Sequence, residues 1–114
     1  LGRERKDSYV NELMKFIIKG GSRNQALVDR LLFSAMIEAR SCERFKLLSE
    51  KVKDKELAEF YRELMISEAG HYTTFIKLAK QYSIDVDVDA RWKEFLEYEA
   101  IVIANYGKEE TIHG

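Results

Sequence analysis

The sequence predicts an all-α fold, and three observations carry that prediction. The 114 residues contain no proline. Strong helix formers such as Leu, Ala, Glu and Lys occur from one end of the chain to the other. Apolar residues recur at intervals of three and four, the period of an amphipathic helix, in four successive segments. We expect a long antiparallel helix hairpin with shorter flanking helices, forming one domain over residues 1–114.

A pair of glycines separates the first two expected helices. The first should run from about Ser8 to Lys19, and Gly20–Gly21 should end it in a left-handed conformation. Ser22 followed by Gln25 has the spacing of a capping box, in which a side chain satisfies free backbone amides. Ser22 should therefore begin a long second helix, which continues to about Ser49.

A polar stretch, "SEKVKDK", separates the second helix from the third and predicts a turn. Asp54 is a suitable N-cap for the third helix, and Glu56 places negative charge in its first turn, where the helix dipole is positive. The apolar period then continues to about Tyr82. The second and third helices should thus form the hairpin.

The last helix should follow an extended segment, "SIDVDVDA", with Asp89 as its N-cap, and should end near Gly107. The apolar stripes expected to be buried are Leu27, Leu31, Ala35, Cys42 and Phe45 on the second helix, Leu57, Tyr61, Leu64, Phe75 and Leu78 on the third, and Trp92, Leu96, Val102 and Tyr106 on the fourth.

Composition excludes several classes of protein. The formal net charge is −1 with acidic and basic residues interspersed, so the chain lacks the strongly basic character of proteins that bind nucleic acid by charge alone. The single cysteine, Cys42, excludes an internal disulfide framework and favours a reducing compartment, the cytoplasm. No apolar run approaches the length of a membrane span, and the start "LGRERKDSYV" is neither a signal peptide nor an initiator methionine.

Two carboxylates lie within apolar stripes. Glu38 follows Leu31 by seven residues and precedes Phe45 by seven, so it projects with them. Glu68 and His71, in "E-A-G-H", occupy the stripe of the third helix in the same way. We expect all three side chains to be buried. A buried, ionised carboxylate costs many kcal/mol unless a proton or cation neutralises it.

The hairpin should bring these side chains together. The midpoint between residues 38 and 68 is residue 53, within the expected turn, so the two glutamates should lie at one height. Each is roughly 22 Å from the turn at about 1.5 Å per residue. Glu-x-x-His together with a Glu from a neighbouring helix is the ligand pattern of carboxylate-bridged di-iron and di-manganese centres in helical bundles. Glu38, Glu68 and His71 are therefore predicted metal ligands.

Other candidates have simpler interpretations. Glu43 lies about 140° around the helix from Glu38 and should pair with a neighbouring arginine at the surface. Cys42 could line an active-site cavity, but a small buried filler is the favoured interpretation. Glu99 is expected first as a boundary residue and second as a partner of a metal ligand. The remaining candidates, interpreted as packing or solvated residues, are Tyr61, Tyr72, Tyr82 and His113.

Two stretches of the chain carry a resemblance to a known family. "ALVDRLLFSAMIEARSCERFKLL" and "ELAEFYRELMISEAGHYTTFIKLA" resemble the MiaE family of tRNA hydroxylases, members of the ferritin-like superfamily. The resemblance implies a ferritin-like bundle and a non-haem di-iron monooxygenase that hydroxylates the isopentenyl group of a hypermodified adenosine in tRNA. It also implies two iron ions held by Glu38, Glu68 and His71, dioxygen as co-substrate, and an electron-transfer protein as external donor. The alternatives are another ferritin-like di-iron oxidase, or a metal-binding helical fragment without activity.

Two departures from the family pattern are visible. The family usually has arginine at the position of Gly70, and glycine within a helix costs about 1 kcal/mol relative to alanine, so close packing or a loosened helix is expected there. Family members also carry a further Glu and a further Glu-x-x-His ahead of the matched region, and no histidine precedes His71 in this chain. The bundle is thus expected to be incomplete, and the chain to be a C-terminal portion.

The remaining ligands could come from two sources. A second copy of the chain could complete the set as a symmetric homodimer, or an N-terminal helical pair of the same polypeptide could supply it. The lack of an initiator methionine favours the second source. Contacts with tRNA, if made by exposed basic residues near the site, should involve Arg3, Arg5, Lys6 and Arg23.

Overall fold

The computed structural model describes the backbone of residues 3–17 and 21–113, and the side chains of residues 8–17 and 21–106. These residues form four helices: α1 (Arg3–Met14), α2 (Arg23–Lys51), α3 (Lys55–Tyr82) and α4 (Val88–His113). No strand occurs in the described ranges, so the all-α prediction is confirmed. None of the helices within these ranges is long and apolar enough to cross a membrane.

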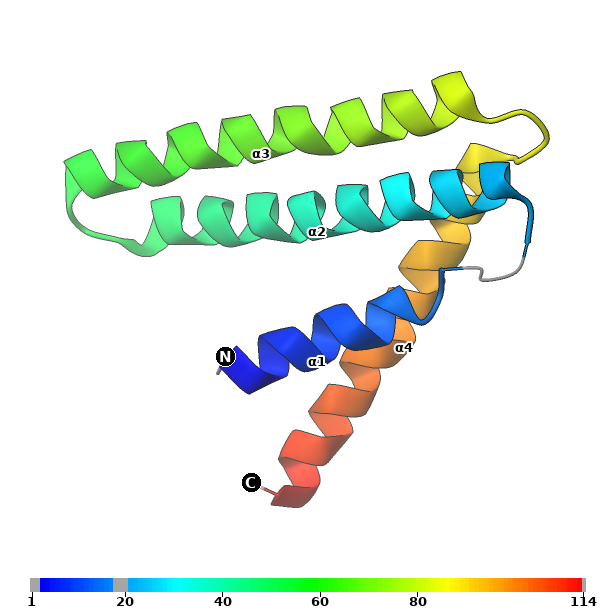
Figure 1. Ribbon diagram of the computed structural model, residues 1–114. Helices are drawn as coiled ribbons and strands as arrows, with labels where there is room; N and C mark the ends of the chain where they lie inside the picture. The colour runs from blue at the N-terminus through cyan, green and yellow to red at the C-terminus, as the bar shows by residue number, and fades with distance from the viewer. Residues whose placement is uncertain (1–2, 18–20, 114) are drawn as a thin grey trace.

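Helices α2 and α3 form the predicted antiparallel hairpin, and α1 and α4 lie together on one side of it (Figure 1). Both hairpin helices begin at the predicted caps. The Ser22 hydroxyl accepts a hydrogen bond from the Gln25 amide at 3.1 Å, and the Asp54 carboxylate accepts one from the Leu57 amide at 3.0 Å. Each bond satisfies an amide that has no partner within its helix.

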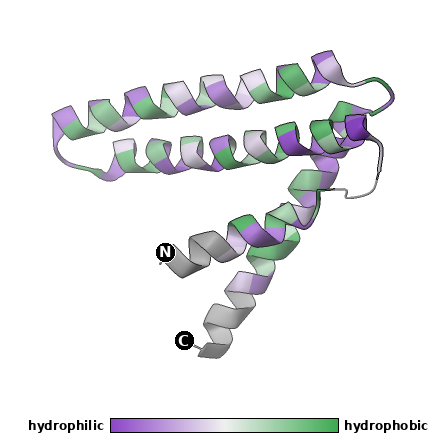
Figure 2. Ribbon diagram, viewed as in Figure 1, coloured by the Kyte–Doolittle hydropathy of each residue, from purple (hydrophilic) through white to green (hydrophobic). Residues whose placement is uncertain are grey.

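The core lies where α2 meets α1 and α4. Its fully buried members include Leu13 of α1, Leu32 and Met36 of α2, and Phe95 of α4. Around them Phe16 packs edge-on against Phe95, with ring centroids 5.0 Å apart, and stacks on Tyr98. Edge-to-face and offset-stacked rings suit the quadrupoles of aromatic groups. Hydrophobic and hydrophilic residues are interspersed along α2, α3 and the coloured parts of α1 and α4 (Figure 2).

Helix α1 differs from the predicted first helix at both ends. It begins at Arg3 and ends at Met14, five residues before the expected Lys19. Beyond Met14 the amides of Lys15, Phe16 and Ile17 each bond a carbonyl three residues back, which tightens the chain into a turn. The Phe16 carbonyl also accepts a hydrogen bond from Arg91, so a tertiary contact stabilises this early end. The expected glycine cap at Gly20 lies outside the described residues.

Helix α4 also differs from its prediction at both ends. The prediction of Asp89 as N-cap is wrong: the Ala90 amide donates to the Asp87 carboxylate at 3.1 Å. Asp89 instead pairs with Lys80 of α3 at 3.1 Å. At the other end the helix continues through Gly107 to His113. A single glycine lowers helix stability only modestly, which is why it did not end this helix.

Some residues of the predicted apolar stripes are not buried. Leu27, Leu57 and Leu96 are 42%, 41% and 37% exposed, whereas their stripes were expected to face the interior. On α4 the burial predicted for Val102 is confirmed, but the other buried residues, Val88, Phe95 and Glu99, lie outside the predicted stripe. Helical period alone does not determine which side of a helix meets a neighbour.

Candidate metal centre

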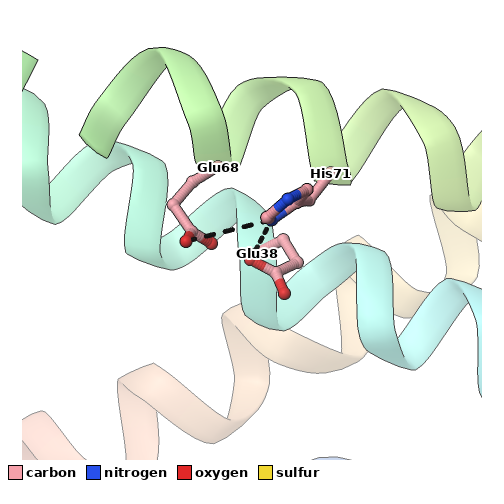
Figure 3. Close-up of side chains that lie close together, drawn as sticks. All are labelled: Glu38, Glu68 and His71. Atoms are coloured by element: carbon pink, nitrogen blue, oxygen red, sulfur yellow. Dashed lines mark ion pairs between the residues drawn. The ribbon is translucent and has the colours of Figure 1, made fainter. Parts of the chain in front are cut away.

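Three side chains from the hairpin meet midway along it. Glu38 projects from α2 toward Glu68 and His71, which lie one turn apart on α3 (Figure 3). The Nδ1 atom of His71 is 3.8 Å from a carboxylate oxygen of Glu38 and 4.0 Å from one of Glu68. One ligand atom from each residue lies within 4.8 Å of the others. A single cation between them could contact all three.

This group is less buried than the sequence predicted. The exposed fractions of the side chains are 26% for Glu38, 20% for Glu68 and 58% for His71. The prediction that they lie in the protein interior is therefore wrong for His71 and only half right for the two glutamates. The reason is the position of the core, which lies on the other side of α2.

Residues on either side of Glu38 show which way it faces. Met36 and Arg40, two residues before and after, project nearly opposite to it because successive residues turn by about 100° around a helix. Met36 is fully buried in the core, and Arg40 bonds Glu99 of α4. Glu38 consequently points away from α1 and α4, and the metal-ligand group opens on the side of the hairpin that these helices leave uncovered.

The helices are held at this height by contacts beside the group. Phe45 of α2 and Tyr61 of α3 stack with ring centroids 6.1 Å apart, toward the hairpin turn. Cys42 donates to the Met65 carbonyl across the α2–α3 contact at 3.5 Å. Cys42 is a free thiol and half-buried. Its position between the helices agrees with the favoured packing interpretation.

The donor set suits a divalent transition metal. Carboxylate oxygens and imidazole nitrogen bind iron, manganese and zinc, and two carboxylates offset the charge of one dication. Three protein ligands leave positions unfilled, since such metals take four to six. The group is therefore chemically fitted to a metal and structurally incomplete as a closed site.

A buried carboxylate outside this group escaped the prediction. Glu99 was expected at the boundary, yet it is only 3% exposed. It accepts hydrogen bonds from the Tyr9 hydroxyl at 2.5 Å and from Arg40 Nε at 2.6 Å, which ties α1 and α2 to α4. Arg40 also pairs with Glu43 at 2.7 Å, so the surface pairing predicted for Glu43 is confirmed. The spacing of Phe95, Glu99 and Val102 by four and three could have revealed it.

These contacts shift two pKa values. Burial and the hydrogen bond to Glu99 raise the pKa of Tyr9 well above the usual tyrosine range. Burial alone would lower the pKa of Arg40, but its hydrogen bonds to Glu99 and Glu43 more than offset this and raise it. Tyr9 therefore stays protonated and donates to Glu99, while Arg40 stays charged.

A second buried ion pair was also missed. Asp29, 1% exposed, accepts two hydrogen bonds from Arg91, at 2.8 and 2.9 Å, in the paired geometry favoured by guanidinium and carboxylate. The hydrogen bond to Asp29 outweighs burial and raises the pKa of Arg91. The guanidinium lies 4.2 Å from the centre of the Phe16 ring, a cation–π contact. The sequence signal that could have indicated the burial of Asp29 is its position directly after Val28, a core residue.

The other predicted residues have ordinary surroundings. Tyr72 contacts Trp92 of α4 with ring centroids 5.8 Å apart, and Tyr82 is 54% exposed. The expectation of close packing at Gly70 is wrong, because nothing lies within 4 Å of where a Cβ would be, and α3 continues through it. Arg23 is exposed. Four other residues singled out in the sequence have side chains outside the described ranges: Arg3, Arg5, Lys6 and His113.

Comparison with known proteins gives the family. The family model described as tRNA-(MS2IO6A)-hydroxylase (MiaE) matches residues 5–114, nearly the whole chain. The chain belongs to the MiaE family. The resemblance found in the sequence around Glu38 and Glu68 is thereby confirmed. Both residues and His71 lie inside the matched range.

Two curated MiaE-family relatives carry the name tRNA 2-(methylsulfanyl)-N(6)-isopentenyladenosine(37) hydroxylase. The one from Salmonella typhimurium is 44% identical over 87 residues, which cover 76% of this chain and 32% of the relative. The one from Pseudomonas putida is 50% identical over 62 residues, 54% of this chain and 30% of the relative. The chain thus matches about a third of each relative's length. No solved structure matches it significantly.

Proposed function

We propose that this chain is the C-terminal, ferritin-like part of a non-haem di-iron monooxygenase that hydroxylates the isopentenyl group of a hypermodified adenosine in tRNA. The family match over residues 5–114 supports the reaction class. The single structural observation that carries the proposal is the meeting of two carboxylates and an imidazole midway along the hairpin. Residues 1–114 would form one domain of the enzyme.

Each of the three residues has a defined part. Glu38 and Glu68 would bind iron through carboxylate oxygens and offset its charge, and His71 would bind through Nδ1, the ring nitrogen that faces both carboxylates. When bound, two irons supply the chemistry that activates dioxygen, with one oxygen atom entering the substrate and the other leaving as water. That stoichiometry needs two electrons, so we include an external electron-transfer protein as a partner.

The surroundings of the group leave room for the ligands that it lacks. His71 is more than half exposed, so the side of the group that still needs ligands faces solvent. The proposed substrate class rests on the family match over residues 5–114 and not on this exposure. We place the protein in the cytoplasm with its tRNA substrate, in agreement with its one, free cysteine.

The decisive experiment is hydroxylation of tRNA that carries the unhydroxylated nucleoside. The chain, Fe²⁺, dioxygen and a reductant should add one oxygen atom to that nucleoside, measured by mass spectrometry of digested tRNA. Glu68→Ala should abolish both product and iron binding, while Glu97→Ala, an exposed acid on α4, should change neither.

Two alternatives give different results in that experiment. Another ferritin-like di-iron oxidase would bind iron and consume dioxygen without modifying the tRNA. A helical fragment without activity would yield no product, with or without weak metal binding. The chain spans about a third of the length of its relatives. The assay should therefore be repeated with a longer family member that carries alanine at the position matching Glu68, which tests the same ligand in a longer protein.

A further inference from the structure

Helix α2, which runs straight along the hairpin, carries a row of positive charges (Figure 1). Its four members follow one another at intervals of seven or fourteen residues: Arg23, Arg30, Arg44 and Lys51. Seven residues make almost two full turns of an α-helix, so residues at this spacing line up along its length. All four are exposed, and we call them the basic row.

The row has no acidic neighbour on its own helix. Side chains three and four positions apart lie next to each other on a helix and form ion pairs at that spacing. The positions of α2 that stand in this relation to the row contain no acid: Ala26, Leu27, Phe33, Ser34, Arg40, Ser41, Leu47 and Leu48. Asp29 and Glu43 directly precede members of the row, but they lie about 100° around the helix and are paired with Arg91 and Arg40.

Other exposed cations of the chain differ from the row in this respect. Lys15, Arg62 and Lys80 each pair with a carboxylate. Among the side chains of residues 8–17 and 21–106, no ion pair involves a member of the basic row. Unpaired charge is unfavourable to bury against another segment of protein. The row therefore marks a surface suited to water or to a negatively charged partner.

The candidate metal centre lies between the two halves of the row. Arg30 is eight residues before Glu38 and Arg44 is six after it, about 12 Å and 9 Å along the helix axis. Val28 and Leu32, two residues to either side of Arg30, are fully buried, so Arg30 projects away from the core, as Glu38 does. A polyanion bound along the row would thus pass beside the metal-ligand group.

We propose that the basic row binds the phosphate backbone of the tRNA substrate, on both sides of the nucleotide that is presented to the candidate metal centre. This inference rests on the proposed function and adds the surface that holds the RNA. A nucleic-acid strand carries a phosphate on every nucleotide, so a linear row of cations can contact several at once. Three of the four members are arginines, whose guanidinium groups bind phosphate through two parallel hydrogen bonds.

The length of the row favours RNA over the other proposed partner. An acidic electron-transfer protein could also bind cations, but a domain of about 100 residues has a radius of gyration of only about 13 Å. The row extends over about 42 Å, so such a protein could not contact both of its ends. An RNA molecule the size of tRNA can follow the whole row. The separation of charge on α2 also explains how a chain with a net charge of −1 could bind RNA.

Fluorescence anisotropy of a labelled tRNA transcript, mixed with the metal-free chain, tests the proposal. Four phosphate contacts predict an affinity that falls about 50- to 150-fold between 50 and 200 mM KCl. Arg30→Glu combined with Arg44→Glu should weaken binding at least about tenfold at 50 mM KCl and reduce the salt effect to about tenfold. Arg30→Lys combined with Arg44→Lys keeps both charges and should retain most of the affinity.

A matched control changes the net charge by the same amount elsewhere on the hairpin. Lys46→Glu combined with Arg62→Glu replaces two exposed cations that have acids beside them, Glu43 three residues before Lys46 and Glu59 at 3.6 Å from Arg62. This double variant should bind tRNA within about threefold of the parent chain, because only the general field of the protein changes. Circular dichroism checks that all variants remain helical.

The other outcomes overturn the inference. Equal losses in the two charge-reversed variants would show that binding follows net charge and not the row. An affinity for tRNA that is unchanged when Arg30 and Arg44 are reversed excludes the row, and if the same change weakens binding of an acidic ferredoxin, the row belongs to the electron-transfer partner. No metal or reaction enters the measurement. A chain that binds tRNA through the row without hydroxylating it would therefore overturn the proposed function and leave the RNA surface standing.

Discussion

The two sides of α2 differ in how far their side chains are buried and paired. On the side facing α1 and α4, Leu32 and Met36 are fully buried, and the buried carboxylates of Asp29 and Glu99 are paired with arginines. On the side of the hairpin that α1 and α4 leave uncovered, the His71 imidazole is 58% exposed and lies 3.8 Å from a Glu38 oxygen and 4.0 Å from a Glu68 oxygen. The first side provides stability, whereas the second has the features of a surface that acquires its partners on binding. Substitutions on each side can test this division.

The largest expected effect is the loss of a core ring. Phe95→Ala should lower the free energy of unfolding by about 3–5 kcal/mol, because it removes a fully buried side chain and leaves a cavity. Phe60→Ala should change it by less than about 1 kcal/mol in the metal-free chain, since Phe60 is half exposed. Urea unfolding followed by circular dichroism measures both. Similar losses for the two variants would mean that Phe60 contributes to the core as much as Phe95 does.

The buried polar cluster should show the next largest effect. Glu99→Gln keeps the shape but removes the charge that receives hydrogen bonds from Tyr9 and Arg40, and should cost about 1.5–3 kcal/mol. Glu97→Gln changes an exposed acid two positions away and should have little effect in the same urea experiment. An equal response to both substitutions would show that the cluster contributes no more to stability than surface charge does.

The pKa of Tyr9 gives the same cluster a pH signature. Its pKa is raised in the folded chain above the ordinary value of 10.0, so the unfolded chain loses this proton first as the pH rises. The stabilisation is fully present below pH 10 and declines above it, by at most about 1.4 kcal/mol per pH unit for one group. Tyr9→Phe should make the decline shallower, measured by urea unfolding between pH 8 and pH 11. Tyr82→Phe, at an exposed ring, should retain the original slope.

Local signals in the sequence predicted the α2–α3 hairpin correctly. The Ser22 and Asp54 caps, the polar turn between the helices and the residue count from that turn were sufficient to place Glu38 opposite Glu68. Each of these signals acts over a few residues or follows from the constant rise of a helix. The meeting of the three candidate ligands therefore follows from the amino-acid sequence and helix geometry alone.

Burial could not be derived in the same way. Leu57 and Leu64 show the same apolar period whether or not another helix covers them, so the stripe did not reveal that Leu57 would be 41% exposed. Asp29 and Glu99 look like surface acids until α4 brings Arg91 to one and Arg40 meets the other. These pairings depend on contacts between residues about 60 positions apart in the chain. A tertiary contact, the hydrogen bond from Arg91 to the Phe16 carbonyl, likewise stabilises the early end of α1.

Gly70 offers the smallest effect and the sharpest contrast with the core. It is exposed within α3, directly before His71, and a Cβ there would meet nothing within 4 Å. Gly70→Ala should therefore raise the free energy of unfolding by about 0.5–1 kcal/mol, because alanine restricts the unfolded chain and favours the helix. Thermal or urea unfolding measures the gain, and Co²⁺ titration should give an unchanged affinity. A loss of stability would mean that this helix requires glycine's freedom beside the site. A gain in stability with weakened metal binding would mean that flexibility at this position serves the metal-ligand group, and that stability and metal binding are not separated on α3 as they are across α2.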